Sequence, residues 1–237
     1  MDVEQIRLAG LQRRHFRARG YLSVPGPPGI QSLVTYVVDL DRQLSLMSTV
    51  TAMDPDGAED EPWLSEPVTA WSTRDGLLVP LPSDDDTGAL WACLPGEHVM
   101  QGPLVLLLVL AGAVSASATP SAAGWVTVVD VDRALEHVPG EHRAALQHFL
   151  DETGLRAGSR VDVNVRLNEG VVATLDAELP AEGDRPRMLL HLAIDPGQAP
   201  AVPKPPVAGA YLDADEIARA WAVDWPEDVP VRPPRPA

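Results

Sequence analysis

Apolar and polar residues alternate along several stretches of this chain. Alternation is typical of β-strands that bury one face, because successive side chains point to opposite sides of a strand. Turn sequences such as Arg74-Asp75-Gly76 and Asn168-Glu169-Gly170 separate neighbouring stretches and predict antiparallel hairpins. The predicted strands are residues 16–24, 32–40, 43–53, 67–73, 77–81, 125–131, 160–167, 171–179 and 187–194.

Two segments have helical patterns instead. Residues 103–114 are apolar on most faces, and residues 132–153 are amphipathic, with an interruption at Pro139-Gly140 that predicts two pieces. An apolar sheet face needs a second layer to cover it, and these helices would supply one. The sequence therefore predicts an α+β fold, with a curved antiparallel sheet of roughly eight to ten strands covered by two or three helices.

The C-terminal part of the chain differs in composition. We expect residues 1–197 to form one domain that binds a hydrophobic ligand, followed in 198–237 by a Pro-rich linker, a short helix and a tail. Residues 198–209 are rich in Pro and Ala and predict a stiff extended linker. The segment from Tyr211 to Trp225 would carry Ile217 and Trp221 on one helix face. It could dock on a protein partner or pack back on its own sheet.

Charge and termini narrow the classes of function. The chain has 237 residues and a formal net charge of −16, which excludes nucleic acid as a partner on electrostatic grounds. No secretory signal follows Met1, which predicts a cytoplasmic protein if Met1 is the native start. If it is not, we expect an extracytoplasmic lipoprotein with its signal removed. The single cysteine, Cys93, lies in an apolar run and predicts a buried thiol.

No catalytic signature stands out. His137, His142 and His148 are five and six residues apart, whereas a helical metal pair needs a spacing of about four. The chain lacks Gly-x-Ser-x-Gly and both common Gly-rich nucleotide motifs. We therefore expect no metal and no cofactor, and the catalytic residues, if there are any, are unknown. The basic cluster around His15 could bind an anionic group, although pairing with acidic residues of its own chain is favoured.

The apolar helix and the one-faced strands indicate a cavity between sheet and helices. The leading hypothesis is a carrier or chaperone that binds a hydrophobic small molecule or lipid there. The alternative is a cytoplasmic cyclase or isomerase that acts on a hydrophobic, polyketide-like substrate in the same cavity, where positioning does most of the catalysis. The predicted ligand-binding residues are Phe16, Leu22, Tyr36, Met47, Trp71, Leu107, Phe149 and Leu150.

Local patterns over residues 124–206 resemble the LolA/LprG-like lipoproteins, also grouped as LppX/LprAFG. Trp125-Val126-Thr127-Val128-Val129-Asp130 resembles the strand before their helix, and Val161-Asp162-Val163-Asn164-Val165 with Asn168-Glu169-Gly170 resembles the hairpin after it. The resemblance implies a strongly curved antiparallel half-barrel closed by helices, with acyl chains or other hydrophobic ligands held between them. It also implies carriage of lipid outside the cytoplasmic membrane. The chain has no lipobox cysteine near its start, and Cys93 is too far inside the chain to serve as one.

Overall fold

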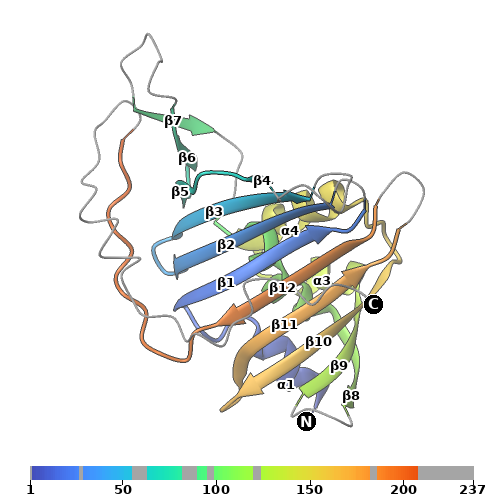
Figure 1. The fold of residues 1–237 in the computed structure, drawn as a ribbon. Helices are drawn as coiled ribbons and strands as arrows, with labels where there is room; N and C mark the ends of the chain where they lie inside the picture. Colours follow the sequence, from blue (N-terminus) through green and yellow to red (C-terminus); the bar gives the residue numbers. More distant parts are fainter. Residues whose placement is uncertain are drawn as a thin grey trace.

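One antiparallel sheet organises the molecule (Figure 1). The computed structural model describes residues 2–26, 29–54, 63–81, 90–94, 99–119, 124–181 and 186–207. Within them, twelve strands form the sheet in the order β7-β6-β5-β3-β2-β1-β12-β11-β10-β9-β8, and β4 pairs with β3 beside this path. The strands are β1 His15–Val24, β2 Gly29–Asp39, β3 Leu44–Asp54, β4 Trp63–Leu64, β5 Val68–Thr73, β6 Gly76–Pro80, β7 Trp91–Leu94, β8 Ala113–Ala118, β9 Gly124–Asp130, β10 Arg160–Asn168, β11 Val171–Leu179 and β12 Met188–Ile194.

The strand order consists of two meanders. Strands β1 to β7 pair in chain order, except that β5 pairs with β3 and not with the short β4, and strands β8 to β12 pair in chain order throughout. The meanders join where β1 pairs with β12, with Ala18 opposite Ile194 and Leu22 opposite Leu190. The curved antiparallel sheet of an α+β fold is thus present as predicted, with more strands than expected. The added strands β4, β7 and β8 are short or lie at the sheet's edges.

The predicted helix at 103–114 is wrong in its length and its end. The structure has a short 3₁₀ turn, η1 (Gly102–Val105), one α-turn, α2 (Leu106–Val109), and a second 3₁₀ turn, η2 (Leu110–Gly112), before β8 begins at Ala113. Close approach to β9 explains the early end, because a Cβ on Gly112 would lie 2.3 Å from the carbonyl oxygen of Asp130. The chain leaves the helix there and pairs with β9 as an edge strand.

The second helical segment divides as predicted. Helix α3 (Val131–His137) ends before Pro139, a 3₁₀ turn η3 (Gly140–His142) follows, and α4 (Arg143–Thr153) ends at Gly154 in the left-handed conformation. Proline cannot continue a helix, and glycine adopts positive φ without strain, so both ends are set by local sequence. No helix in the described parts of the chain is long and apolar enough to cross a membrane.

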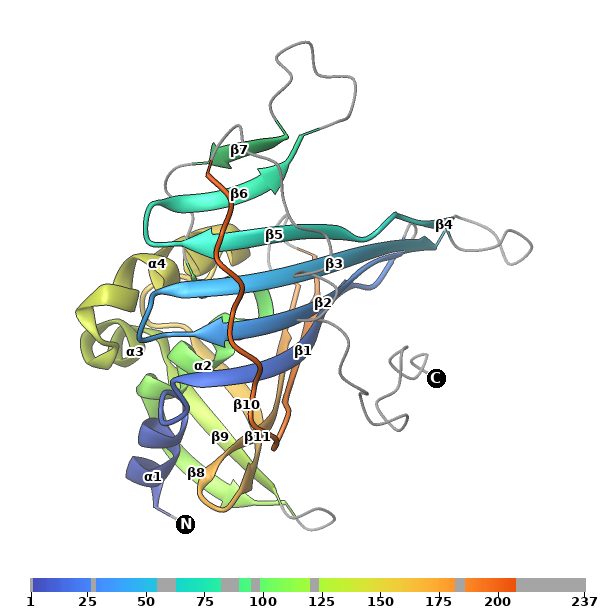
Figure 2. The ribbon, with the colours of Figure 1, turned by 90° about the vertical axis from the view of Figure 1, so that its left-hand side faces the viewer.

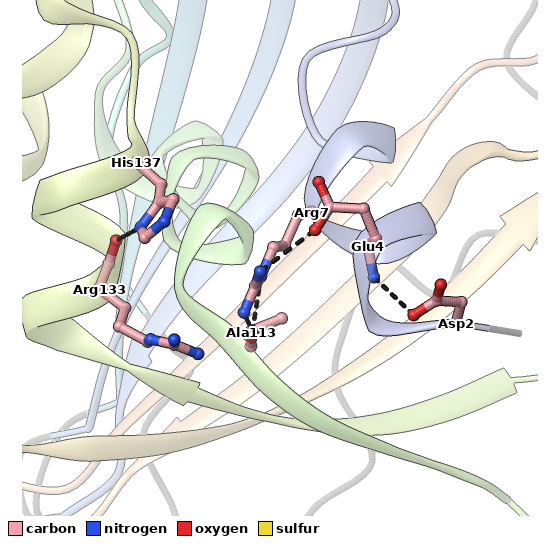
Figure 3. A network of polar contacts seen from close by, with 6 residues as sticks. All are labelled: Asp2, Glu4, Arg7, Ala113, Arg133 and His137. Atoms are coloured by element: carbon pink, nitrogen blue, oxygen red, sulfur yellow. Dashed lines mark hydrogen bonds and ion pairs between the residues drawn. The ribbon is translucent and has the colours of Figure 1, made fainter.

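Helix α1 (Val3–Ala9) precedes the first strand and lies beside β8 (Figure 3). The Asp2 carboxylate caps it by accepting a hydrogen bond from the backbone N–H of Glu4. Arg7 pairs with Glu4 and donates from Nε and Nη2 to the carbonyl oxygen of Ala113, at 2.8 and 2.6 Å. A residue of the first helix thereby holds the chain at the point where the helical segment becomes β8.

The helices and one face of the sheet share a single hydrophobic cluster, called here the inner layer. Every residue from Leu104 to Leu110 is buried in it. Gly20 of β1 allows η1 to approach, since a Cβ at this position would lie 2.7 Å from the Cβ of Pro103. Residues of even number on β1, β2 and β12, such as Phe16, Ala18 and Tyr36, and residues of odd number on β10, such as Val163, supply the other side of the layer.

A second cluster, the outer layer, lies on the opposite face of β2, β3, β5, β6 and β7. Its centre is a cross-strand row of Val37, Leu46, Trp71 and Leu78. Residues 195–207, called here the strap, cross this face on the side away from α2 and α4 (Figure 2). Ala199 and Val202 of the strap are buried in the cluster. Residues 198–207 of the predicted linker have no helix or strand, and Ala199 and Val202 among them pack against the sheet.

Candidate functional site

The structure gathers seven of the eight predicted ligand-binding residues in the inner layer. Phe16, Tyr36, Leu107, Phe149 and Leu150 are buried in it, and the half-buried Leu22 and Met47 pack against it. Trp71 lies in the outer layer instead. Successive side chains of a strand point to opposite faces, so Trp71 lies on the other face of β5 from Ala70. Its indole Nε1 donates to the carbonyl oxygen of Pro203 at 3.3 Å.

Side chains fill the space between the sheet and the helices. The void that remains there has a volume of about 10 Å³ and is lined by apolar residues only. A single water molecule needs about that volume, so the void is far too small for an acyl chain. Its lining is Leu106, Val109, Val131, Ala134, Leu146, Phe149, Leu150, Leu155, Val161 and Leu179.

Tyr36 brings a polar group into the inner layer. Its side chain is 2% exposed, and its hydroxyl donates to the carbonyl oxygen of Gln101 at 3.4 Å. Burial raises the pKa of this phenol far above its usual value, because the charged form would lose its hydration. Tyr36 is therefore a neutral hydrogen-bonding group and has no role as a base.

A cleft of about 500 Å³ opens beside the inner layer. It lies between the β2–β3 turn, the β5–β6 turn, residues 99–100 and the beginning of α4. Its apolar residues Leu40, Val99, Met100 and Ala145 belong to the inner layer as well. The rest of its lining is polar or charged, namely Arg14, Asp41, Gln43, Thr73, Arg74, Glu141 and His142. The cleft is thus an amphipathic opening next to an apolar core.

His142 is the most unusual group in this cleft. Its side chain is only 2% exposed, and its Nε2 is buried with no hydrogen-bond partner among the described residues. Desolvation lowers its pKa, nearby Arg14 lowers it further, and Glu141 partly offsets the shift. The position at the N-terminus of α4 also disfavours a positive charge. The imidazole is therefore neutral near pH 7 and able to accept or donate one proton.

Charge in the cleft is balanced, although the chain as a whole is strongly acidic. Arg14 Nε and Asp41 Oδ1 form an ion pair at 2.9 Å. Arg74 and Glu141 come from different elements, are exposed, and form no ion pair within the described ranges. The cleft therefore presents one guanidinium and one carboxylate that are not already paired there.

Helix α4 connects the cleft with the inner layer. Ala145 lines the cleft, whereas Leu146, Phe149 and Leu150 line the void, so successive turns of one helix contact both. The helix packs mainly against η3, η1 and α3. Pro139-Gly140 and Gly154 flank it, and a Cβ on Gly140 would contact nothing within 4 Å. Displacement of α4 would open the inner layer toward the cleft.

The basic cluster near the N-terminus pairs within the chain, as the sequence favoured. Arg17 forms a buried ion pair with Asp195 at 2.8 Å, and Arg13 donates to the backbone of the strap at Asp195 and Pro196. His15 Nε2 lies 2.9 Å from the carbonyl oxygen of Pro200. Most of this cluster thus holds the strap, and only Arg14 contributes to the cleft.

Three further expectations have different outcomes. Cys93 is exposed, so the prediction of a buried thiol is wrong; it lies on β7, an edge strand that pairs on one side only. No group of three metal-binding side chains occurs among the described residues. The segment from Tyr211 to Trp225 lies outside the described residues.

Sequence patterns did not reveal the cleft. The spacing of His142 bears only on metal binding, and Glu141, Gln43 and Arg74 lie in turns that carry no functional motif. One backbone signal exists in the structure, since Gln43 has a φ of +50°, a conformation that non-glycine residues rarely adopt. Its side-chain amide donates to the carbonyl oxygen of Leu40 at 2.9 Å, which helps to stabilise that turn.

Comparison with known proteins does not identify a family for this chain. No family model matches this chain, and no curated protein matches it. Among solved structures, the bifunctional dehydratase-cyclase domain of ambruticin biosynthesis is similar, with 17% sequence identity, 75% of this chain and 74% of that chain covered, and a TM-score of 0.17. A score this low establishes neither a shared fold nor a shared activity.

Proposed function

We propose that this protein binds a hydrophobic small molecule or lipid between the curved sheet and its helices and acts as a carrier or chaperone. The observation that carries the proposal is the contact between a predominantly apolar inner layer and an amphipathic cleft, with α4 between them. An apolar ligand would replace side-chain contacts with contacts of the same kind. The described conformation is then the closed, unliganded form.

The order of elements supports the resemblance to LolA/LprG-like lipoproteins, which remains part of this proposal. A first helix precedes a meander of strands, an apolar helical segment crosses to the second meander, and a divided helix follows β9. In this proposal the sheet is a half-barrel, and the helices close its open side. The small volume left in the inner layer means that uptake requires α4 to move.

Binding of the uncharged fluorescent probe N-phenyl-1-naphthylamine tests the proposal. The wild-type protein is expected to bind it with enhanced fluorescence, and Ala145→Trp, which fills the cleft beside α4, is expected to weaken binding at least tenfold. Ala144→Trp places the same indole on an exposed position of the same helix and should leave binding unchanged. Thermal melts show whether Ala145→Trp remains folded, and Ala145→Met gives a milder change. Absence of probe binding to the wild type would contradict the proposal.

Native mass spectrometry of protein purified from its own host gives an independent readout. A discrete apolar adduct, recovered by organic extraction, would identify the cargo. If the protein has a clean apo mass and also fails to bind the probe, a carrier function is wrong.

The second candidate is a cyclase or isomerase that acts on a hydrophobic, polyketide-like substrate. One observation favours it, namely the buried imidazole of His142 in the cleft wall, whose lowered pKa leaves it unprotonated near pH 7 and so able to accept a proton from a substrate. The test is turnover of candidate substrates by the wild type, His142→Gln and His148→Gln. A loss of at least a hundredfold in His142→Gln alone would support the enzyme, and equal rates in all three would exclude His142 from the chemistry.

A further inference from the structure

The polar half of the cleft points to the kind of head group that the ligand carries. We infer that the cleft receives the zwitterionic head group of an amphiphile, with its anionic part at Arg74 and its cationic part at Glu141, while the apolar chain runs beneath α4. This inference rests on the proposed function, because it assigns the polar end of the same ligand.

The positive and negative charges that line the cleft are equal in number. The guanidinium groups of Arg14 and Arg74 balance the carboxylates of Asp41 and Glu141, and the imidazole of His142 is neutral. A ligand with net charge of either sign would meet one attractive and one repulsive group of comparable strength. A ligand that carries both charges can satisfy both groups.

Two of the four charged side chains in the cleft pair with each other, and two do not. Arg14 and Asp41 already neutralise each other at 2.9 Å, so they form a fixed part of the wall. Arg74 lies in the β5–β6 turn and Glu141 lies in η3, and neither has an ion-pair partner in the part of the chain that the structure describes. These two side chains are the groups still available to a charged ligand.

The cleft also has an apolar part of its lining. Leu40, Val99, Met100 and Ala145 line the cleft and are continuous with the inner layer. A head group at the level of Arg74 and Glu141 would therefore have its alkyl chain directed onto apolar residues. The volume of about 500 Å³ accommodates a head group of the size of phosphocholine or phosphoethanolamine together with the first methylenes of its chain.

Four amphiphiles with one dodecyl chain and different head groups test the inference. Dodecylphosphocholine is zwitterionic, dodecyl phosphate is anionic, dodecyltrimethylammonium is cationic and dodecanol is uncharged. Each competes with N-phenyl-1-naphthylamine below its micelle concentration. Dodecylphosphocholine is expected to compete at a concentration about fivefold lower than dodecanol, the advantage expected of two solvent-exposed ion pairs.

Single substitutions should change the preference in opposite directions. Arg74→Gln is expected to reduce the advantage of dodecylphosphocholine to about twofold and to favour the cation over the anion. Glu141→Gln is expected to reduce it equally and to favour the anion. Arg133→Gln and Glu136→Gln on α3 change the net charge in the same way at exposed positions outside the cleft, and they should leave every preference as in the wild type.

The outcomes separate the inference from the proposed function. If dodecanol and the probe fail to bind, the proposed function is wrong. If all four amphiphiles bind equally, or if the cleft and control variants behave alike, the ligand site stands and the head-group assignment is overturned. A preference for either singly charged head group in the wild type would also overturn it.

Discussion

The two faces of the sheet are covered in different ways. Apolar side chains from short helices pack against the inner face, and every residue from Leu104 to Leu110 is buried there. An extended strap covers part of the outer face and buries Ala199 and Val202. Backbone oxygens of the strap accept hydrogen bonds from side chains of the sheet, including those of Arg42 and Trp71.

The difference concerns how easily each cover can move. Apolar contacts are not directional, so an apolar ligand can replace those of the inner layer with little net change in free energy. Hydrogen bonds and the Arg17–Asp195 ion pair need fixed geometry, and a displaced strap would leave buried polar groups without partners. The inner face is therefore the one suited to exchange a ligand.

The largest expected effect comes from the inner layer. Leu108 is fully buried, and Leu108→Ala should lower the free energy of unfolding by about 2–5 kcal/mol through lost burial and an added cavity. The same variant should bind N-phenyl-1-naphthylamine more tightly, because the cavity enlarges the apolar space. Urea denaturation with and without the probe measures both effects. Leu8→Ala, at a position 59% exposed, is the control and should change stability by less than about 0.5 kcal/mol.

The next effect tests the polar attachment of the strap. Asp195→Ala removes the ion-pair partner seen for Arg17, whose side chain is 5% exposed, and should lower the free energy of unfolding by on the order of 2 kcal/mol, less than for a fully buried pair. Probe binding at the inner layer should be unchanged. Asp41→Ala breaks the exposed pair with Arg14 and should cost less than about 1 kcal/mol. Equal losses of stability in Asp195→Ala and Asp41→Ala would show that the buried ion pair contributes no more than the exposed one.

A smaller effect concerns the indole beneath the strap. Trp71→Phe keeps an aromatic ring but loses the hydrogen bond to Pro203, and it should cost about 1–2 kcal/mol including the lost volume. Trp91→Phe changes the neighbouring ring of the same edge-to-face pair. Because no described hydrogen bond involves the Trp91 indole, its loss should be smaller. If Trp91→Phe is the more destabilising of the two in chemical denaturation, the hydrogen bond to the strap is not what holds this face.

The smallest expected effect is a dependence of stability on pH that comes from His142 in the cleft. The pKa of His142 is lowered in the folded state, so the unfolded chain takes up a proton first as the pH falls below about 6.5. Stability should then decrease by at most about 1.4 kcal/mol per pH unit until the folded-state pKa is reached, and it should be unaffected above pH 7. His142→Gln should flatten this slope, and His148→Gln, on the exposed face of α4, should retain it. An unchanged slope in His142→Gln would assign the pH dependence to other groups.

The strands were predictable because they have one buried face. The alternation in 160–167 and 171–179 corresponds closely to β10 and β11, and the hairpin at 32–53 corresponds to β2 and β3. Strand β8 was missed, because its Ala and Ser residues carry no apolar alternation and its pairing with β9 decides its conformation. Trp71 was placed on the wrong face because the sequence gives no sign that the outer face is also covered.

The candidate site was less predictable than the fold. The inner-layer residues follow from periodicity, since Leu146, Phe149 and Leu150 share a helix face in the sequence. The cleft does not, because it joins turns that are far apart in the chain, such as those at Gln43, Arg74 and Glu141. The strap was predicted as a linker from its prolines, and its binding to the outer face depends on side chains contributed by the sheet.

The pairing of β1 with β12 has a consequence for the order of folding. Most strand pairs within the meanders join segments close in the chain and can form soon after synthesis, whereas this pair joins residues such as Ala18 and Ile194 from opposite ends of the domain. Until β12 is made, β1 has an edge with unpaired backbone groups, open to association with other chains. Closure of so long a loop is slow in folding reactions. A nascent chain that stops before β12 would therefore be prone to aggregate, and the addition of β12 and the strap would complete the core and the outer cover in one late step.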